Sequence, residues 1–468
     1  MIVFLFCQNR NTVKSWTYFN NLNILLKLLF FLQIILITWG CSGTRVEFMF
    51  PMFVVAVVMF TIISFGKEKA TCVFEKLLSV ILLILVAVCL IQYLNPFLER
   101  INGERFIYYK SLEYIKWLPT SVRAEFFEGN AMRALMEIST VLMSSIVCIR
   151  LFSDRKFMRM ALAFFVINVA FMGVFAIWQC NSGIVIMYNK FYANTDLFGT
   201  FYMANAAGAF FNLGLSASIA LFAYFVHKKG YKKLYSLVFL LCLFVCSYAT
   251  YRSDSQGSII LMGLTLLASG LMVLIYVVYK KMLVPFFVLL LFVSASIVAV
   301  SLWYILPKDI DVYNPDSSMK YKGISESISS RVKMYVVCKD IISKYPIYGI
   351  GGNCCQYVLT KEMVKKQENL SKTHAKSTQH AHSDIIEYAI DFGLIGVVSI
   401  FLCFVFWLRA FFKSIPSYES FVLLLGVFVS IIHSCFDMNL HIMSTMIAFV
   451  LIAIASIKWG SGRLEKYE

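Results

Sequence analysis

Residues 77–95 read LLSVILLILVAVCLIQYLN, an uncharged and almost wholly apolar run. An α-helix needs about 20 such residues to cross the hydrocarbon core of a bilayer, which is about 30 Å thick. Similar runs lie near 22–40, 46–65, 132–150, 157–178, 203–226, 233–249, 257–279, 283–306, 384–408, 419–437 and 440–457. The sequence therefore predicts an all-α fold, a polytopic membrane bundle of about twelve transmembrane helices. The short connection at 437–440 could instead be a kink within one helix, which would reduce the count to eleven.

The composition of the whole chain agrees with a membrane protein. Of the 468 residues, 60% are hydrophobic and only 15% are charged, whereas soluble proteins carry about 25% charged residues. This excludes a disordered chain, a collagen-like chain and a water-soluble multidomain enzyme. The net charge of +16 indicates basic residues at cytoplasmic helix ends and contact with anionic lipid. We therefore expect membrane lipid as a partner and no nucleic acid.

Basic residues gather in alternate connections between the predicted helices, which indicates the orientation of the chain. The connections near 66–76, 150–159, 228–233, 280–281 and 409–413, and the C-terminal end, are rich in Lys and Arg. By the positive-inside rule these segments and both termini are cytoplasmic. The connection 96–131 is an exception, because we expect it outside although it carries five basic residues; it carries five acidic ones as well.

This orientation divides the chain into three parts. Residues 1–306 form the first part of the bundle with about nine helices, residues 307–383 form a large external loop, and residues 384–468 form the last part with about three helices. A loop of that length in a compact fold is usually functional.

Within the loop, residues 329–346 (SSRVKMYVVCKDIISKYP) have the spacing of a short amphipathic helix. Arg331 lies in its first turn, where a bound anion would relieve the unfavourable interaction of Arg with the helix dipole. The alternative is an ordinary surface arginine.

Histidines are concentrated in the part of the chain that we expect outside. His374, His380, His382, His433 and His441 all map there. Ser383 can cap the helix that follows, and the positive end of its dipole favours a neutral His382, the form that acts as a base. A metal site formed by His374, His380 and His382 matches no known signature, so we expect neither a metal nor a cofactor.

Other polar residues at the external end form a second group of candidates. His380, Asp384, Glu387 and Asp391 share one helix face, which could also be a polar interfacial stripe. Asp437 and His441 lie at the turn between the last two helices, and Arg252 lies in the turn between the seventh and eighth. Asn205 is near membrane depth and needs a partner, while the small residues around it could serve close helix packing.

Four stretches together resemble the O-antigen ligase and O-antigen polymerase superfamily of bacterial polysaccharide membrane proteins. They are GTFYMANAAGAF (199–210), RVKMYVVCKDIISKYPIYGIGG (331–352), HAHSDIIEYAIDFGLIG (380–396) and HSCFDMNLHI (433–442). The sequence departs from the family pattern at Ser383, where the family usually has Asn after the His, and at Gln256, where it often has Arg. Arg252 could fill the role of that second Arg from one helical turn earlier, or the site could do without it.

The resemblance implies an inner-membrane glycosyltransferase. It would transfer a glycan from undecaprenyl diphosphate to an acceptor sugar, on lipid A–core or a similar molecule, by inverting, metal-independent chemistry at the periplasmic face. His382 and Arg331 would be catalytic, and Arg252, Asn205, His380, Asp437 and His441 would bind the diphosphate or substrate. A polymerase that joins lipid-linked repeat units shares this site, and the single dominant loop leans towards the ligase. The alternative of another class is a transporter of lipid-linked sugar or an organic anion.

Overall fold

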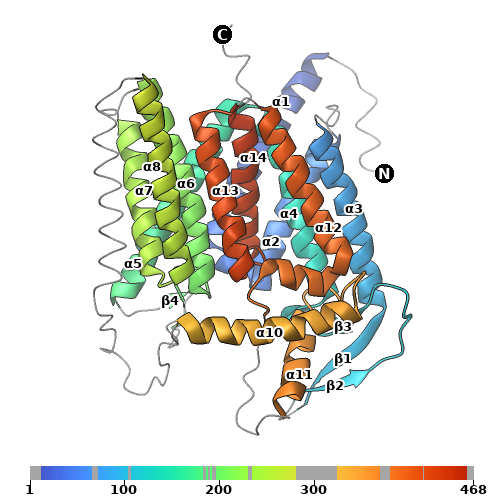
Figure 1. Ribbon diagram of the computed structural model, residues 1–468. Helices are drawn as coiled ribbons and strands as arrows, with labels where there is room; N and C mark the ends of the chain where they lie inside the picture. Colours follow the sequence, from blue (N-terminus) through green and yellow to red (C-terminus); the bar gives the residue numbers. More distant parts are fainter. Residues whose placement is uncertain are drawn as a thin grey trace.

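The computed structural model describes residues 12–65, 72–103, 107–182, 186–187, 190–191, 197–229, 234–280, 324–368, 380–414 and 416–460. Long helices stand side by side in a bundle (Figure 1). They are α1 (Thr12–Trp39), α2 (Val46–Phe65), α3 (Val73–Leu94), α4 (Ala131–Leu151), α5 (Arg155–Ser182), α6 (Ala204–Lys229), α7 (Leu234–Arg252), α8 (Gln256–Lys280), α12 (Asp384–Lys413), α13 (Tyr418–Phe436) and α14 (Met443–Gly460).

Ten helices in the described ranges, α1 to α7 and α12 to α14, are long and apolar enough to cross a membrane. The helix α8 has a shorter apolar segment, Gln256–Met272. All predicted spans except 283–306, which lies outside the described residues, coincide with one of these helices. The count of about twelve therefore stays a prediction. The connection at 437–440 is a turn between two separate helices rather than a kink.

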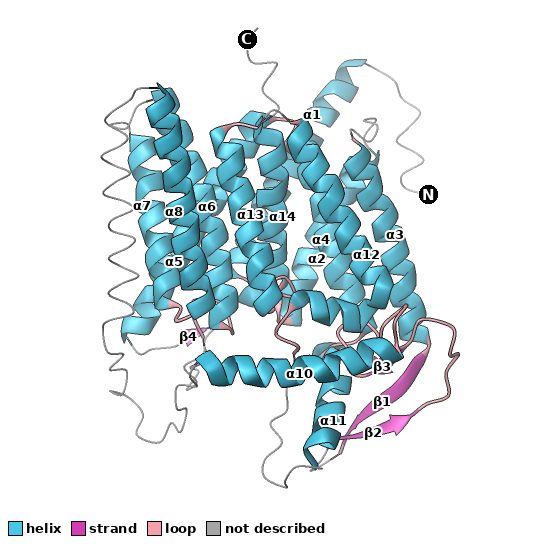
Figure 2. Ribbon diagram, in the orientation of Figure 1, coloured by secondary structure: helices cyan, strands magenta, loops and turns pink. Residues whose placement is uncertain are grey.

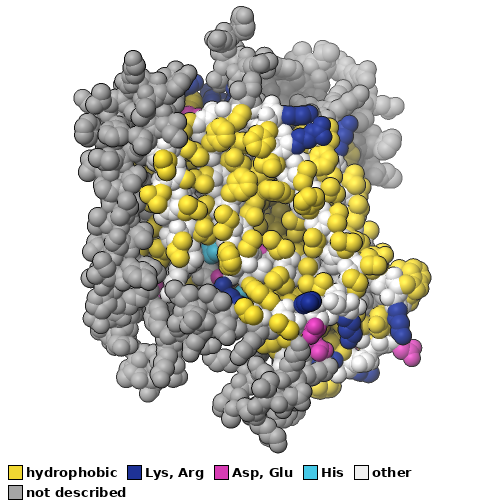
Figure 3. Space-filling model, in the orientation of Figure 1, with side chains coloured by type: hydrophobic (Ala, Val, Ile, Leu, Met, Phe, Trp, Pro, Cys, Tyr) yellow, Lys and Arg dark blue, Asp and Glu magenta, His cyan; other side chains and the backbone are white. Residues whose placement is uncertain are grey.

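Apolar side chains cover the side of the bundle, and charged ones gather at its two ends (Figure 3). Large hydrophobic residues such as Leu83, Leu241 and Phe401 are exposed on this band. Such exposure is favourable only where the surrounding medium is lipid. The polytopic membrane bundle predicted from the sequence is thus confirmed.

One part of the chain departs from the all-α prediction. Residues 96–123 form a three-stranded sheet of β1 (Pro96–Asn102), β2 (Ile107–Ser111) and β3 (Ser121–Arg123), in which β1 pairs antiparallel with β2 and parallel with β3 (Figure 2). A second, two-stranded sheet joins β4 (Ile186–Met187) and β5 (Lys190–Phe191). The side chain of Asn95 holds the loop after β2, because it bonds the backbone of Ile115 and Pro119. Strands this short carry too weak a periodic signal to be recognised beside long apolar runs.

The helix α10 (Ile324–Lys344) lies across one end of the bundle, next to the sheet and α11 (Cys355–Glu368) (Figures 1 and 2). It begins five residues before the amphipathic helix predicted at 329–346 and ends at Lys344. Arg331 therefore lies in the interior of α10 rather than in its first turn, so the predicted placement of Arg331 at the helix N-terminus is wrong. The buried face of α10 packs into a small separate core, in which Met334, Val337 and Ile341 meet Leu98 of β1 and Tyr357 of α11. This core fixes the position of α10 over the bundle, and we name this side of the molecule the α10 end.

The helix α12 is broken at Gly393, whose φ of 58° and ψ of −147° are not helical. The segment after α10 packs into the break: the N–H of Leu394 donates to Pro346, and the N–H of Ile350 donates to Ile390. A Cβ at Gly393 would lie 2.6 Å from the carbonyl group of Ile347, so only glycine fits here. The break places the first turns of α12 at the α10 end, where they carry three carboxylates.

Candidate functional site

Asp437, directly after α13, is the point where four of the predicted site residues meet. Its Oδ1 lies 3.5 Å from Nδ1 of His382, and its Oδ2 lies 3.9 Å from Nη2 of Arg331. The side-chain amide of Asn205, at the start of α6, donates to the same carboxylate. The predicted need of Asn205 for a partner is thus met by a residue 232 positions away.

The Asp437 carboxylate is 5% exposed and remains ionised. Burial alone would raise its pKa, but the facing imidazole of His382 and the backbone N–H of Met438 bring the pKa below its usual value. A buried carboxylate that keeps its charge can stabilise a positive charge on His382 and orient the guanidinium of Arg331.

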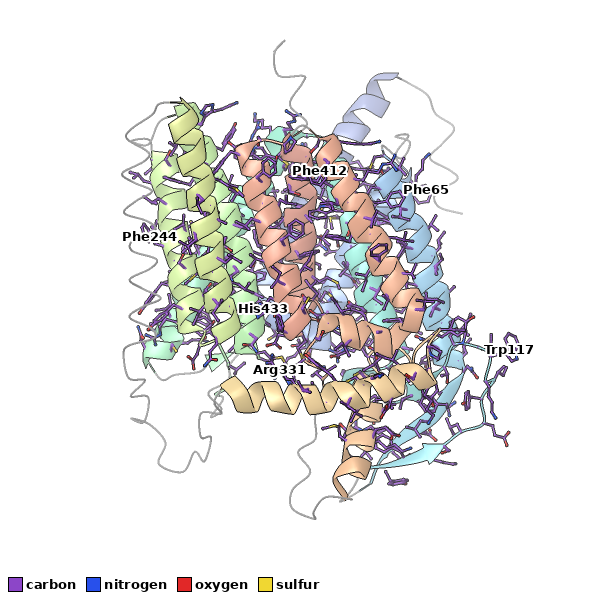
Figure 4. All side chains as sticks on the ribbon, viewed as in Figure 1. Phe65, Trp117, Phe244, Arg331, Phe412 and His433 are labelled. Carbon is purple, nitrogen blue, oxygen red and sulfur yellow. The ribbon has the colours of Figure 1, made fainter. Side chains whose placement is uncertain are left out.

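Arg331 reaches the bundle from α10 and bonds the end of a membrane helix. Its Nη1 donates to the carbonyl oxygen of Phe436 at 2.6 Å, one of the carbonyls left unpaired where α13 ends. Figure 4 shows Arg331 between α10 and the lower end of α13, which also carries His433. The side chain is 29% exposed, and a guanidinium has five N–H groups, so donors remain for an anion.

His382 is held in an unusual backbone conformation. Its φ is 47°, which is uncommon for a residue with a side chain and is characteristic of functional sites. Tyr335, one turn after Arg331 on α10, donates its hydroxyl to the carbonyl oxygen of His382. The Nδ1 atom is buried, with no partner among the described residues closer than Asp437. Since 44% of the side chain is exposed, the open edge of the ring is the one with Nε2.

The two other predicted histidines form a second, buried cluster with the acidic face of α12. Nδ1 of His441 lies 2.9 Å from Oδ1 of Asp384, and its Nε2 lies 3.8 Å from Glu387. Nδ1 of His380 lies 2.9 Å from the same Glu387 carboxylate. Burial would lower the pKa of His441, but the Glu387 and Asp384 carboxylates raise it to about 10. These carboxylates therefore favour the protonated, positively charged form of His441.

The third carboxylate on this face, Asp391, binds the start of α11. It accepts the backbone N–H groups of Asn353 at 2.8 Å and Cys355 at 2.9 Å. The predicted shared face of Asp384, Glu387 and Asp391 is thus confirmed, and it faces protein rather than the membrane interface. His380 lies before α12 begins and joins this face only through its contact with Glu387, so its predicted place on the helix is wrong.

A cleft of about 260 Å³ opens beside this cluster. His380, Glu387 and His441 form part of its wall, together with Arg133 and Glu137 of α4. Sequence reasoning missed these two α4 residues and also Gln92 of α3. The buried side chain of Gln92 bonds the backbone of Tyr348, Asp391 and Gly352. The position of Gln92 near the end of a long apolar run could have indicated a buried polar side chain with a structural partner.

Arg252 lies apart from the residues around Asp437. It contacts the side chains of Cys180 on α5 and Tyr248 one turn earlier, and no contact joins it to Arg331 or His382 within the described part of the chain. The small residues near Asn205 serve close packing, because Gly208 lies directly against Ser258 of α8. Within the described ranges no three His, Cys, Asp or Glu side chains are placed to hold a metal ion, and His374 lies outside these ranges.

The fold is that of a multi-pass membrane protein with a histidine, an arginine and a carboxylate together at one end of the bundle. Comparison with known protein families identifies which kind: residues 241–401, about a third of the chain, match the family model described as O-antigen ligase. This match confirms the predicted resemblance to the O-antigen ligase superfamily. No curated protein matches the chain.

The matched region runs from α7 to α12 and includes Arg331 and His382. Asn205, Asp437 and His441 lie outside it and join the site only through the fold. The family implies a membrane glycosyltransferase-like enzyme of the bacterial inner membrane that handles lipid-linked glycans.

Proposed function

We propose that the protein transfers a glycan from undecaprenyl diphosphate to an acceptor sugar on lipid A–core or a similar molecule, as an O-antigen ligase. The observation that carries this proposal is the single carboxylate of Asp437, which faces both a base, His382, at 3.5 Å and a cation, Arg331, at 3.9 Å. In this reading the α10 end and the loop 307–383 are periplasmic, and both termini are cytoplasmic.

His382 acts on the acceptor. The acceptor hydroxyl oxygen attacks the anomeric carbon of the donor sugar, and the bond from that carbon to the diphosphate oxygen breaks. The electron pair of this bond leaves with the diphosphate, and the proton of the hydroxyl passes to Nε2 of His382. The charge that develops on the ring is stabilised by the Asp437 carboxylate behind it.

Arg331 acts on the donor. A leaving diphosphate gains negative charge in the transition state, and a guanidinium matches its oxygens in bidentate geometry. The bond from Arg331 to Phe436 fixes the guanidinium at the end of the membrane helix α13, the level at which a diphosphate carried on a polyisoprenyl chain would meet the protein. Arg252 remains a candidate for a second contact with the diphosphate.

The experiment is replacement of the two residues in the living bacterium. His382→Ala and Arg331→Ala should each abolish surface glycan attachment while the protein is present at normal levels. Matched controls are His227→Ala at the opposite end of the bundle and Lys339→Ala on the exposed face of α10, which should retain attachment. Normal surface glycan in both site variants would refute the assignment.

The same gels separate the ligase from the polymerase. Loss of a ligase leaves full-length lipid-linked chains unattached, whereas loss of a polymerase leaves single repeats attached to the core. Loss of a transporter would instead leave no lipid-linked glycan on the periplasmic side of the membrane.

A further inference from the structure

The cleft of about 260 Å³ lies directly beside the proposed reaction centre. Met438 contributes to its wall while its neighbour Asp437 faces His382, and His380 contributes to its wall while His382 lies two residues further on. Consecutive Cα atoms are 3.8 Å apart. Two separate segments of the chain therefore place the cleft within a few residues' length of the base.

The charges in the cleft are already paired. Nε of Arg133 lies 3.0 Å from Glu137, His380 lies 2.9 Å from Glu387, and His441 contacts Glu387 as well. Each basic side chain in the wall thus faces a carboxylate of the protein. A phosphate group would meet these carboxylates and be repelled. The cleft therefore disfavours the anionic groups that Arg331 attracts.

The cleft wall fits a hydroxylated ring. The amide nitrogens of Asn353 and Gln356 are bonded to Glu137 and to the backbone of Glu128. Their amide oxygens and the carboxylates offer acceptors for sugar hydroxyls, while Tyr202 and Met203 offer apolar surface. Polar groups set in apolar surface are the pattern of small-molecule sites, whose volumes usually begin at about 300 Å³. A cleft slightly below that size suits one sugar unit.

We propose that this cleft binds one uncharged pyranose unit of the glycan substrate, next to the bond that is formed. This inference rests on the proposed function, because it assumes that a glycan reaches His382. The sugar could belong to the acceptor or to the donor, and both present the same hydroxyl chemistry to the cleft wall.

The test is direct binding to the purified full-length protein in lipid nanodiscs, measured by saturation-transfer NMR. Two probes are purified oligosaccharides of the producing bacterium: the core oligosaccharide and the oligosaccharide of a single repeat unit. Met203→Trp places a larger ring in the cleft and should weaken binding of one probe at least about tenfold. Met203→Leu, which keeps the volume, should bind as the wild type does, as should Ile107→Trp on the exposed side of β2.

The probe that loses binding identifies the sugar as that of the acceptor (core) or of the donor (repeat unit). The inference is overturned when neither probe binds the wild type, when Met203→Trp binds normally, or when inorganic pyrophosphate displaces the sugar. The proposed function fails separately, through normal glycan attachment in the His382→Ala cells. Binding to the cleft does not need His382, so the two failures are distinguishable.

Discussion

Replacement of Asp437 by Asn tests whether this carboxylate supports the charge on His382. Asn has the same shape and keeps an oxygen for one of the donors, so the change removes mainly the charge. Unit charges about 4 Å apart interact by about 4 kcal/mol at an effective dielectric constant of about 20, and the observed separations are 3.5 Å and 3.9 Å. If about half a charge has formed on the imidazole in the transition state, the loss is about 2 kcal/mol, or a rate about 30-fold lower.

The assay is transfer by purified protein in nanodiscs, with lipid-linked glycan as donor and core lipid as acceptor. Asp437→Asn should lower kcat by about 30-fold with little change in KM for the acceptor, and its melting temperature should stay near that of the wild type. Asp437→Ala should also lower the melting temperature, because the Asn205 amide and the Met438 N–H lose their buried partner. A wild-type kcat for Asp437→Asn would refute the role of Asp437 behind His382.

Three further predictions address the rest of the site. The pKa of His441 is raised to about 10 from a usual 6.5. The ion pairs of His441 therefore stabilise the fold fully below pH 6.5, and this stabilisation is lost as the pH rises through 10. His441→Asn should therefore lower the unfolding free energy by about 3–5 kcal/mol near neutral pH, and thermal melts of the two proteins should converge above pH 10. Gly393→Ala should cost about 1–3 kcal/mol or more, because the added Cβ meets the Ile347 carbonyl in a backbone conformation that favours glycine, and the yield of folded protein should fall. Asn205→Asp should reduce transfer at pH 7 at least about tenfold, because two carboxylates would face each other at Asp437, and acidification should restore part of the rate.

Separate controls check these three. Melts of the two proteins that differ equally at pH 6 and pH 10 would contradict the charged His441. Full stability of Gly393→Ala would contradict the break in α12. Asn205→Leu, which carries no charge, should lose less transfer than Asn205→Asp; equal losses would remove the repulsion argument.

The membrane spans were predictable because each apolar run is determined locally by the solvent it must face. The run at 77–95, for example, was predicted to span the membrane, and residues 77–94 lie in α3. The proximity of Arg331, His382 and Asp437 was also predictable in part, because the sequence placed all three residues at the same end of the bundle. The cleft was not, because it depends on Arg133 and Glu137, and a helix N-terminus with an i, i+4 ion pair is an ordinary local feature.

The break in α12 also escaped prediction, and its reason is tertiary. Gly393 lies inside a long apolar pattern that reads as continuous helix, and nothing in that pattern marks a bend. The backbone groups freed there are satisfied by Pro346 and Ile347, about 50 residues earlier. The segment after Pro346 likewise carries no sequence signal that it packs against a second helix.

The carboxylates of α12 bind backbone groups of neighbouring segments, whereas His382 beside them does not. Asp391 accepts two backbone N–H groups, and Asp384 accepts those of Leu440 and His441. Backbone donors thus occupy the oxygens of both carboxylates, which ties α12 to the segments that supply these donors. His382 differs, because its only close ionic contact in the described structure uses Nδ1 and leaves the other edge of the ring open. The acidic face therefore joins α12 to α11 and to the turn after α13, whereas His382 keeps 44% of its side chain exposed for contact with a substrate.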